Sequence, residues 1–167
     1  ANIFIAHIRF KSNEISVQMK TREQGFMDYL KKNGFSGKVY HVEVDPDDYE
    51  GSLNAIEEIV KEKSDLVGGI VLNSRVYELV KLLEKMKPEL RNKIRLIGHD
   101  AIERNVTALK SDQISFILSQ RPELQGYDAI KAFGNYFLFK QIPEKVNYMP
   151  IDILIKENID FYDNYKL

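Results

Sequence analysis

The chain of 167 residues has no cysteine, which excludes a disulfide framework, a thiolate metal site and cysteine catalysis. No apolar run approaches the roughly 18 residues that a membrane span requires, so we expect no contact with a membrane. The 24 Lys and Arg residues are balanced by 25 Asp and Glu residues, and a net charge of -1 gives the chain itself no electrostatic basis for binding nucleic acid. With 44% hydrophobic residues, the chain is expected to fold around one core.

Signatures of cofactor binding are also missing. The sequence has neither a GxGxxG fingerprint nor a P-loop, and Gly68-Gly69 lies inside an apolar run of strand type, where glycine favours close packing. The three histidines, His7, His41 and His99, fall in three separate segments without the local spacing of a metal site. The sequence therefore predicts no cofactor and no metal.

Strand-like and helix-like segments alternate along the chain. Short apolar or alternating runs predict strands at residues 3–8, 38–44, 67–72, 94–99 and 114–118, with a last extended segment around Pro150. Helical spacing predicts two helices that begin with capping boxes at 21–24 and 47–50. A third helix is expected to begin after Asn73 and Ser74 and to end at Pro88, and a fourth is expected at 124–140. Residues 107–109 are expected to be extended. This order is typical of an α/β fold with a doubly wound, mostly parallel sheet.

Ligands of such open sheets bind outside the carboxyl ends of the strands. The polar residues just after the expected strands are Arg9, Asp45, Asn73, Asp100 and Ser119 to Arg121. Side chains of these types hold ligands with several hydroxyl groups, because carboxylates and amides accept hydrogen bonds and the arginine fork spans adjacent oxygens. A purely structural interpretation stays open, in which Asp100 caps the next turn and Arg22 pairs with an acid on its own helix.

A catalytic interpretation is also open at one of these positions. His99 directly precedes Asp100 at a strand end, and such a pair could serve in acid/base chemistry if its geometry allowed. No nucleophile accompanies the pair and no substrate suggests itself. We therefore expect that the protein is not an enzyme.

Four separated motifs resemble the ligand-binding module of lactose-repressor-like (LacI/GalR) transcriptional regulators, in the order of that family. Arg22-Glu23-Gln24-Gly25-Phe26 is similar to the family's R-x-x-G-F motif. Ile70-Val71-Leu72-Asn73 is similar to a strand of the family that ends in a polar residue before the next helix. Ile97-Gly98-His99-Asp100 resembles its V/I-G-x-D. Gln120 through Gly126 resembles its crossover segment.

The resemblance implies a periplasmic-binding-protein-like fold and a role in sensing a small effector. Residues 1–119 would form the second lobe, 120–141 a crossover helix against a first lobe, and 142–167 the return strand and tail. Effector contacts would fall on Arg22, Asn73, Asp100 and Gln120. The effector would be a sugar or sugar phosphate, and the regulator would be a cytoplasmic homodimer that reaches operator DNA through a separate helix-turn-helix.

Two further expectations concern the rest of the molecule. The chain opens inside an apolar run without an initiator Met, which favours a fragment of a longer protein. The expected helix at 124–140 carries a large apolar face that must be covered by its own sheet, by another copy or by exchange between copies. An extracellular solute-binding domain of a transporter or sensor kinase remains the alternative to the regulator.

Overall fold

The computed structural model describes residues 1–9, 16–45, 47–62 and 67–162. They form one six-stranded sheet in the order β2-β1-β3-β4-β5-β6, parallel except for β6, which pairs antiparallel with β5. This confirms the predicted α/β fold with a mostly parallel sheet. The strands are β1 (Asn2–Ile8), β2 (Val39–Val44), β3 (Val67–Val71), β4 (Ile94–His99), β5 (Phe116–Ser119) and β6 (Asp152–Leu154).

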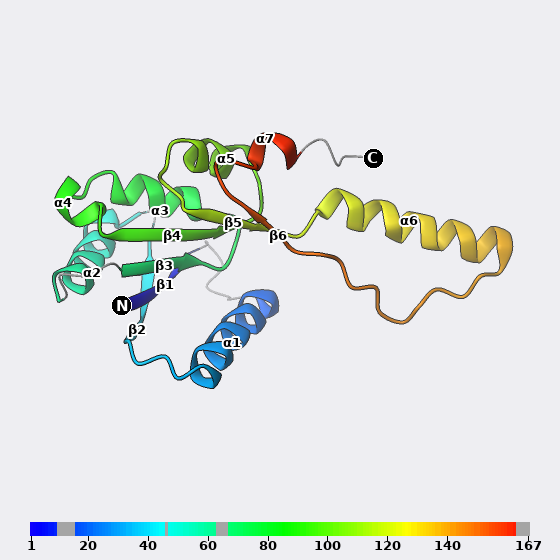
Figure 1. The fold of residues 1–167 in the computed structure, drawn as a ribbon, viewed down its shortest axis with the longest axis horizontal. Helices are drawn as coiled ribbons and strands as arrows, with labels where there is room; N and C mark the ends of the chain where they lie inside the picture. The colour runs from blue at the N-terminus through cyan, green and yellow to red at the C-terminus, as the bar shows by residue number, and fades with distance from the viewer. Residues whose placement is uncertain (10–15, 46, 63–66, 163–167) are drawn as a thin grey trace.

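The direction of each connection decides which face of the sheet a helix covers (Figure 1). The step from β1 to β2 runs one way along the sheet and the later parallel steps run the other way, so right-handed crossovers place α1 alone on one face. The opposite face carries α2, α3 and α5. The helices are α1 (Val17–Lys32), α2 (Tyr49–Lys61), α3 (Val76–Leu83), α4 (Pro88–Arg91), α5 (Glu103–Lys110), α6 (Pro122–Phe139) and α7 (Ile159–Tyr162).

The core lies mainly on the face covered by α2, α3 and α5. Alternate strand residues such as Phe4 and Leu96 point into it and meet Leu79 and Leu109 from the helices, all of them buried. The face under α1 holds a smaller cluster, in which Ile5, Ile70 and Leu72 are buried.

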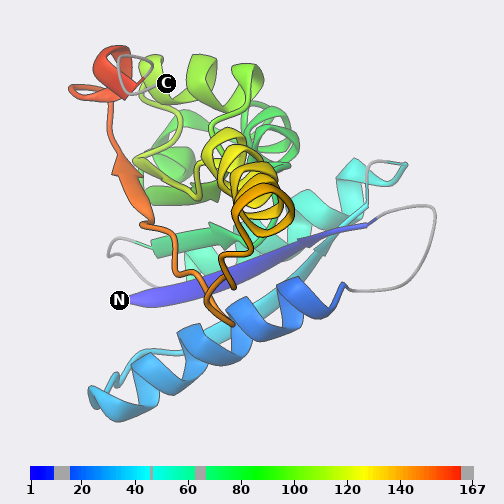
Figure 2. The ribbon, with the colours of Figure 1, turned by 90° about the vertical axis from the view of Figure 1, so that its right-hand side faces the viewer.

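Helix α6 extends away from the sheet, and the chain returns beside it as an extended segment that leads to β6 (Figures 1 and 2). None of the residues of α6 is buried. Its large apolar side chains are exposed, among them Tyr127, Ile130, Phe133, Phe137 and Leu138. The expected docking of this helix onto its own sheet is therefore not seen.

Three expected helix starts are corrected. Helix α2 is capped by Asp48 and not by Asp47, because the Asp48 carboxylate accepts a hydrogen bond from the Gly51 N–H at 3.1 Å. Helix α1 begins before Thr21, because Ser16 caps it by accepting a hydrogen bond from the Met19 N–H at 3.2 Å. The Thr21 hydroxyl instead donates to the Val17 carbonyl inside the helix. Asn73 and Ser74 are not N-caps either: α3 has Arg75 at that position, and Asn73 accepts a hydrogen bond from its N–H in a local turn.

The expected extended segment at Thr107 to Leu109 is wrong. These residues belong to α5, whose buried residues Asn105, Ala108 and Leu109 follow the three-and-four spacing of one helix face. Pro88 does not stop α3, which ends at Leu83, but opens α4. Pro122 occupies the same position at the start of α6, which begins two residues before the expected start at 124.

Two glycines are required by close packing. A Cβ on Gly69 would lie 2.5 Å from the Phe4 ring, and one on Gly98 would lie 2.5 Å from a methyl group of Val76. The packing role expected for the glycines of β3 is thus confirmed at Gly69. Gly126 in α6 has nothing within 4 Å among the described residues, so no close packing requires it.

Candidate functional site

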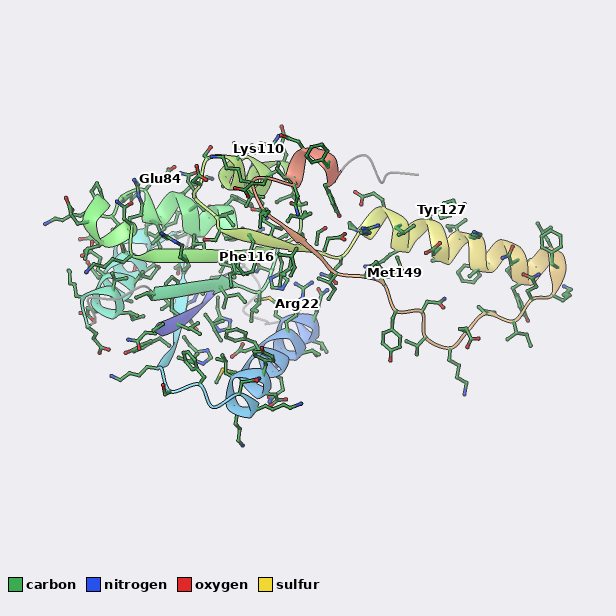
Figure 3. The ribbon with its side chains drawn as sticks, in the orientation of Figure 1. Arg22, Glu84, Lys110, Phe116, Tyr127 and Met149 are labelled. Carbon is green, nitrogen blue, oxygen red and sulfur yellow. The ribbon has the colours of Figure 1, made fainter. Side chains whose placement is uncertain are left out.

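The four predicted contact residues lie along the edge where the parallel strands end. Asn73 and Asp100 follow β3 and β4, and Gln120 follows β5. Arg22 belongs to α1, and Figure 3 shows it near the end of the helix that lies beside this edge. All four side chains are partly exposed, so the edge can be reached by a ligand.

Arg22 is oriented by the strand edge and not by an acid of its own helix. Its Nη1 donates a hydrogen bond of 2.6 Å to the carbonyl of Leu72, the residue before Asn73. The guanidinium has five N–H donors in a planar fork, so one backbone contact fixes its direction and leaves donors for a ligand. The structural alternative for Arg22 is therefore wrong.

Asp100 and Gln120 contact each other across the ends of β4 and β5. The Gln120 amide donates to the Asp100 carboxylate at 3.4 Å, and the Asp100 N–H donates to the Leu118 carbonyl at 2.8 Å. Asp100 has a φ of 65°, a left-handed conformation that turns its side chain out of the strand direction. Its side chain does not cap α5, which begins after Ile102 without a side-chain cap.

Asn105 holds the two loops of this edge together, although sequence reasoning did not single it out. Its side chain is fully buried on α5 and its amide donates to the carbonyls of Ser74, His99 and Asp100. Its carbonyl oxygen accepts from the N–H of Tyr77 at 3.3 Å. A polar residue at a buried helical position shortly after Asp100 was the available signal, and the expectation of an extended segment at 107–109 concealed the helix.

An ion pair that the sequence did not predict joins the residue before α6 to the first residue of β6. Arg121 donates from Nε and Nη2 to the two carboxylate oxygens of Asp152, at 2.5 and 2.8 Å. These hydrogen bonds hold the pKa of Asp152 below its ordinary value, against a smaller opposite effect of burial. Arg121 itself has a φ of 51°, so the chain turns sharply at this junction.

His99 is placed for structure and not for catalysis. Its side chain is buried and Nδ1–H donates to the Val71 carbonyl at 2.8 Å, which fixes the tautomer. Burial lowers the pKa of His99 below its ordinary value, and the Val71 carbonyl and the Asp100 charge oppose that shift only in part. A buried neutral imidazole bound to a backbone carbonyl does not support the acid/base interpretation of His99 and Asp100.

A cavity of about 590 Å³ lies at the other edge of the sheet. It is lined by residues near the start of β4 and the ends of α3 and α5, such as Arg91, Ile94 and Gln113. None of the four predicted contact residues lines it. The four residues of the strand-end edge are instead partly exposed polar side chains.

Residues 9–141 match the family model described as a periplasmic binding protein domain, and the chain belongs to this family. Among solved structures, it is similar to a protein of Bacteroides fragilis that is provisionally described as a LacI transcriptional regulator. That similarity has a TM-score of 0.80 and 34% identity, over 96% of this chain and 55% of the other.

Less similar sequences share the fold. A periplasmic ribose ABC transporter protein of Conexibacter woesei matches with a TM-score of 0.70 and 17% identity, over 99% of this chain and 54% of its own. A periplasmic solute binding protein of Actinobacillus succinogenes, solved with D-allose, matches with a TM-score of 0.67 and 19% identity, over 96% of this chain and 55% of its own.

The chain thus spans about half the length of these solved structures. A search of curated proteins finds no match. Within the described residues, no helix combines the length and apolar character needed to cross a membrane.

Proposed function

We propose that this chain is one lobe of the effector-sensing domain of a LacI/GalR-like transcriptional regulator, and that the effector is a sugar or sugar phosphate. The observation that carries the proposal is the 34% identity, over 96% of the chain, to the Bacteroides fragilis protein described as a LacI regulator. The sugar-like effector is supported by the family and by solved relatives whose names include ribose and D-allose.

The strand-end edge suits a polyhydroxyl ligand. Arg22 presents a fork of donors held by the Leu72 carbonyl, and Asp100 presents a carboxylate held beside Gln120. Asn73 supplies an amide from the neighbouring loop. Charge-assisted hydrogen bonds of this kind give both affinity and orientation.

The mechanism proposed is closure of the facing first lobe over this edge. An exposed apolar helix such as α6 and an open polar edge are what one lobe presents when the facing lobe is not beside it. A ligand that touches both lobes binds the closed arrangement better and shifts the equilibrium by its differential affinity alone. In a cytoplasmic homodimer, that shift would change operator binding through a helix-turn-helix outside this chain.

The likeness to transporter proteins favours a second candidate, an extracellular solute-binding domain with the same site. The two candidates share the ligand chemistry and differ in what is joined to the domain. The coding sequence upstream of this chain separates them: a helix-turn-helix supports the regulator, and a secretory signal supports the solute-binding domain.

Thermal unfolding of the full-length gene product with a panel of sugars, sugar phosphates and nucleobases tests the ligand class. A single-site ligand at about 100 times its Kd should stabilise the fold by roughly 2.7 kcal/mol. The stabilisation should disappear in Arg22→Ala and in Asp100→Asn, since asparagine tolerates the left-handed backbone of that position.

Asp112→Asn is the matched control, because Asp112 also has a positive φ, of 59°, but lies at the other edge of the sheet. It should leave the ligand effect unchanged. A ligand effect that survives both Arg22→Ala and Asp100→Asn would contradict the proposed site, and a folded protein that responds to no sugar or sugar phosphate would contradict the proposed ligand class.

A further inference from the structure

Three side chains capable of binding a metal meet under α1, although the sequence predicted no metal site. His7 of β1 and His41 of β2 point to the same face, because the parallel register pairs His41 with Ile5, two residues before His7. Glu23 reaches the same place from α1, which covers that face. Glu23 lies 16 positions after His7 and 18 positions before His41, so no local spacing revealed the three residues.

The potential ligand atoms have the separations of a coordination sphere. His7 Nε2 lies 3.3 Å from His41 Nδ1. Of the two carboxylate oxygens of Glu23, Oε2 lies 3.6 Å from His7 Nε2 and Oε1 lies 3.3 Å from His41 Nδ1. Bonds of about 2.0–2.1 Å to a tetrahedral zinc ion place its ligand atoms roughly 3.3–3.4 Å apart. One ligand atom from each of the three residues lies within 4.8 Å of the other two, so small side-chain movements would bring all three onto one zinc ion.

The hydrogen bonds of the cluster do not by themselves explain its residues. His7 Nε2 and His41 Nδ1 face each other at 3.3 Å, so only one of them can donate a hydrogen to the other. Nδ1 of His7 is buried with no partner in the described part of the chain. A buried polar atom without a partner costs free energy that an apolar side chain would avoid. A ligand role for Nε2 supplies a reason for an imidazole at this position.

Access and chemistry both suit a divalent transition metal. The His41 side chain is 49% exposed whereas His7 is 14% exposed, so an ion can enter from the His41 side and keep a water in its fourth position. Imidazole and carboxylate ligands together favour zinc and its neighbours over calcium or magnesium, which prefer oxygen alone.

We propose that His7, Glu23 and His41 bind one zinc-type divalent ion that links α1 to β1 and β2. Helix α1 has a single buried residue, Met19, so an ion bound through Glu23 would add a strong attachment to a helix with little buried surface. The site uses none of the four residues of the proposed ligand edge, and its test does not depend on the identity of the effector.

Titration of the tag-free protein with zinc chloride in a calorimeter tests the proposal. One zinc ion should bind per chain. His41→Ala should weaken zinc affinity by at least about tenfold, since losing even a group that only orients a metal ligand lowers metal affinity 10–100-fold. The half-exposed position of His41 makes its replacement harmless to folding. Glu23→Gln should weaken binding as well, whereas the matched control Glu58→Gln, on the exposed side of α2, should not.

Cobalt(II) provides a second readout, because tetrahedral coordination gives intense visible absorption. The bands should appear with the wild-type protein, disappear on addition of excess zinc, and be missing in His41→Ala. Absence of saturable one-to-one binding by the folded wild type would overturn the proposal. Equal zinc affinity of the wild type and His41→Ala would overturn it too.

Discussion

The two faces of the sheet are held in different ways. The face under α2, α3 and α5 buries a continuous apolar core, in which Leu79, Leu82 and Leu109 are fully covered. The face under α1 has three buried apolar residues and places polar groups among them, including His99 and the cluster of His7, Glu23 and His41.

The difference assigns most of the stability to one face, whereas both proposed binding sites use residues of the other. Apolar burial is strong but without direction, whereas the contacts of α1 depend on specific polar groups such as Arg22 and Glu23. Helix α1 contributes Arg22 to the proposed ligand edge and Glu23 to the proposed metal site. A helix with little buried surface can respond to ligands at a smaller cost than one fixed in the main core.

The largest effect is expected from a cavity in the main core. Leu79→Ala should lower the free energy of unfolding by about 2–5 kcal/mol, because Leu79 is fully buried. Met27→Ala, on the partly buried surface of α1, should cost clearly less. Urea denaturation of both variants measures the difference, and equal losses would refute the contrast between the two faces.

The next effect is expected at Asn105, which connects the core to the ligand edge. Asn105→Ala removes every hydrogen bond of a fully buried amide and should cost about 2 kcal/mol. It should also weaken the binding of any ligand that needs Asp100, since the Asp100 carbonyl loses its partner. Asn54→Ala, on the exposed side of α2, is the control and should change neither stability nor binding.

A smaller, pH-dependent effect is expected from His99 on the α1 face. Because burial lowers its pKa in the folded state, the unfolded chain takes up the proton first as the pH falls below about 6.5. Stability should therefore decrease from pH 7.5 to pH 5.5, with a contribution of no more than about 1.4 kcal/mol per pH unit from this one proton.

Denaturation midpoints at several pH values test the role of His99. His99→Gln should show a shallower decrease between pH 7.5 and 5.5, although it is less stable throughout. Leu79→Ala should retain the wild-type slope, because it removes no titrating group. An unchanged slope in His99→Gln would contradict the assignment.

The smallest effect is expected at the outer edge of the α1 face. Arg9 and Glu43 form an ion pair in which both side chains are more than half exposed, and water and salt screen such pairs. Glu43→Gln should leave the unfolding midpoint within experimental error at physiological salt. A clear loss of stability would mean that the α1 face depends on this pair, and the contrast between the faces would need revision.

Much of the fold followed from periodicity in the sequence. The apolar runs at 3–8, 67–72 and 94–99 predicted strands that the structure contains, because parallel strands buried on both faces need continuous apolar residues. Helix α6 was also predicted, although it begins at Pro122 and not at 124. The start of α1 and the helical state of 107–109 were missed, because a serine cap and a short amphipathic turn carry weak local signals.

The ligand edge was partly predictable for the same reason. Strand ends of a parallel sheet share one edge, so Asn73, Asp100 and Gln120 could be placed there before any geometry was known. That these residues and Arg22 bind the effector stays a prediction. Asn105 and the Arg121–Asp152 pair could not be predicted, because their partners lie on other segments and are brought to them by folding.

The sequence by itself determined the class of fold, the order of the elements and the strand-end edge that Asn73, Asp100 and Gln120 share, since all three depend on local periodicity and on the rules of parallel sheets. Only the tertiary structure decided which face each helix covers, that α6 extends away from the sheet, and that His7, Glu23 and His41 meet. These outcomes depend on crossover direction and strand register, which bring together residues that no local pattern connects.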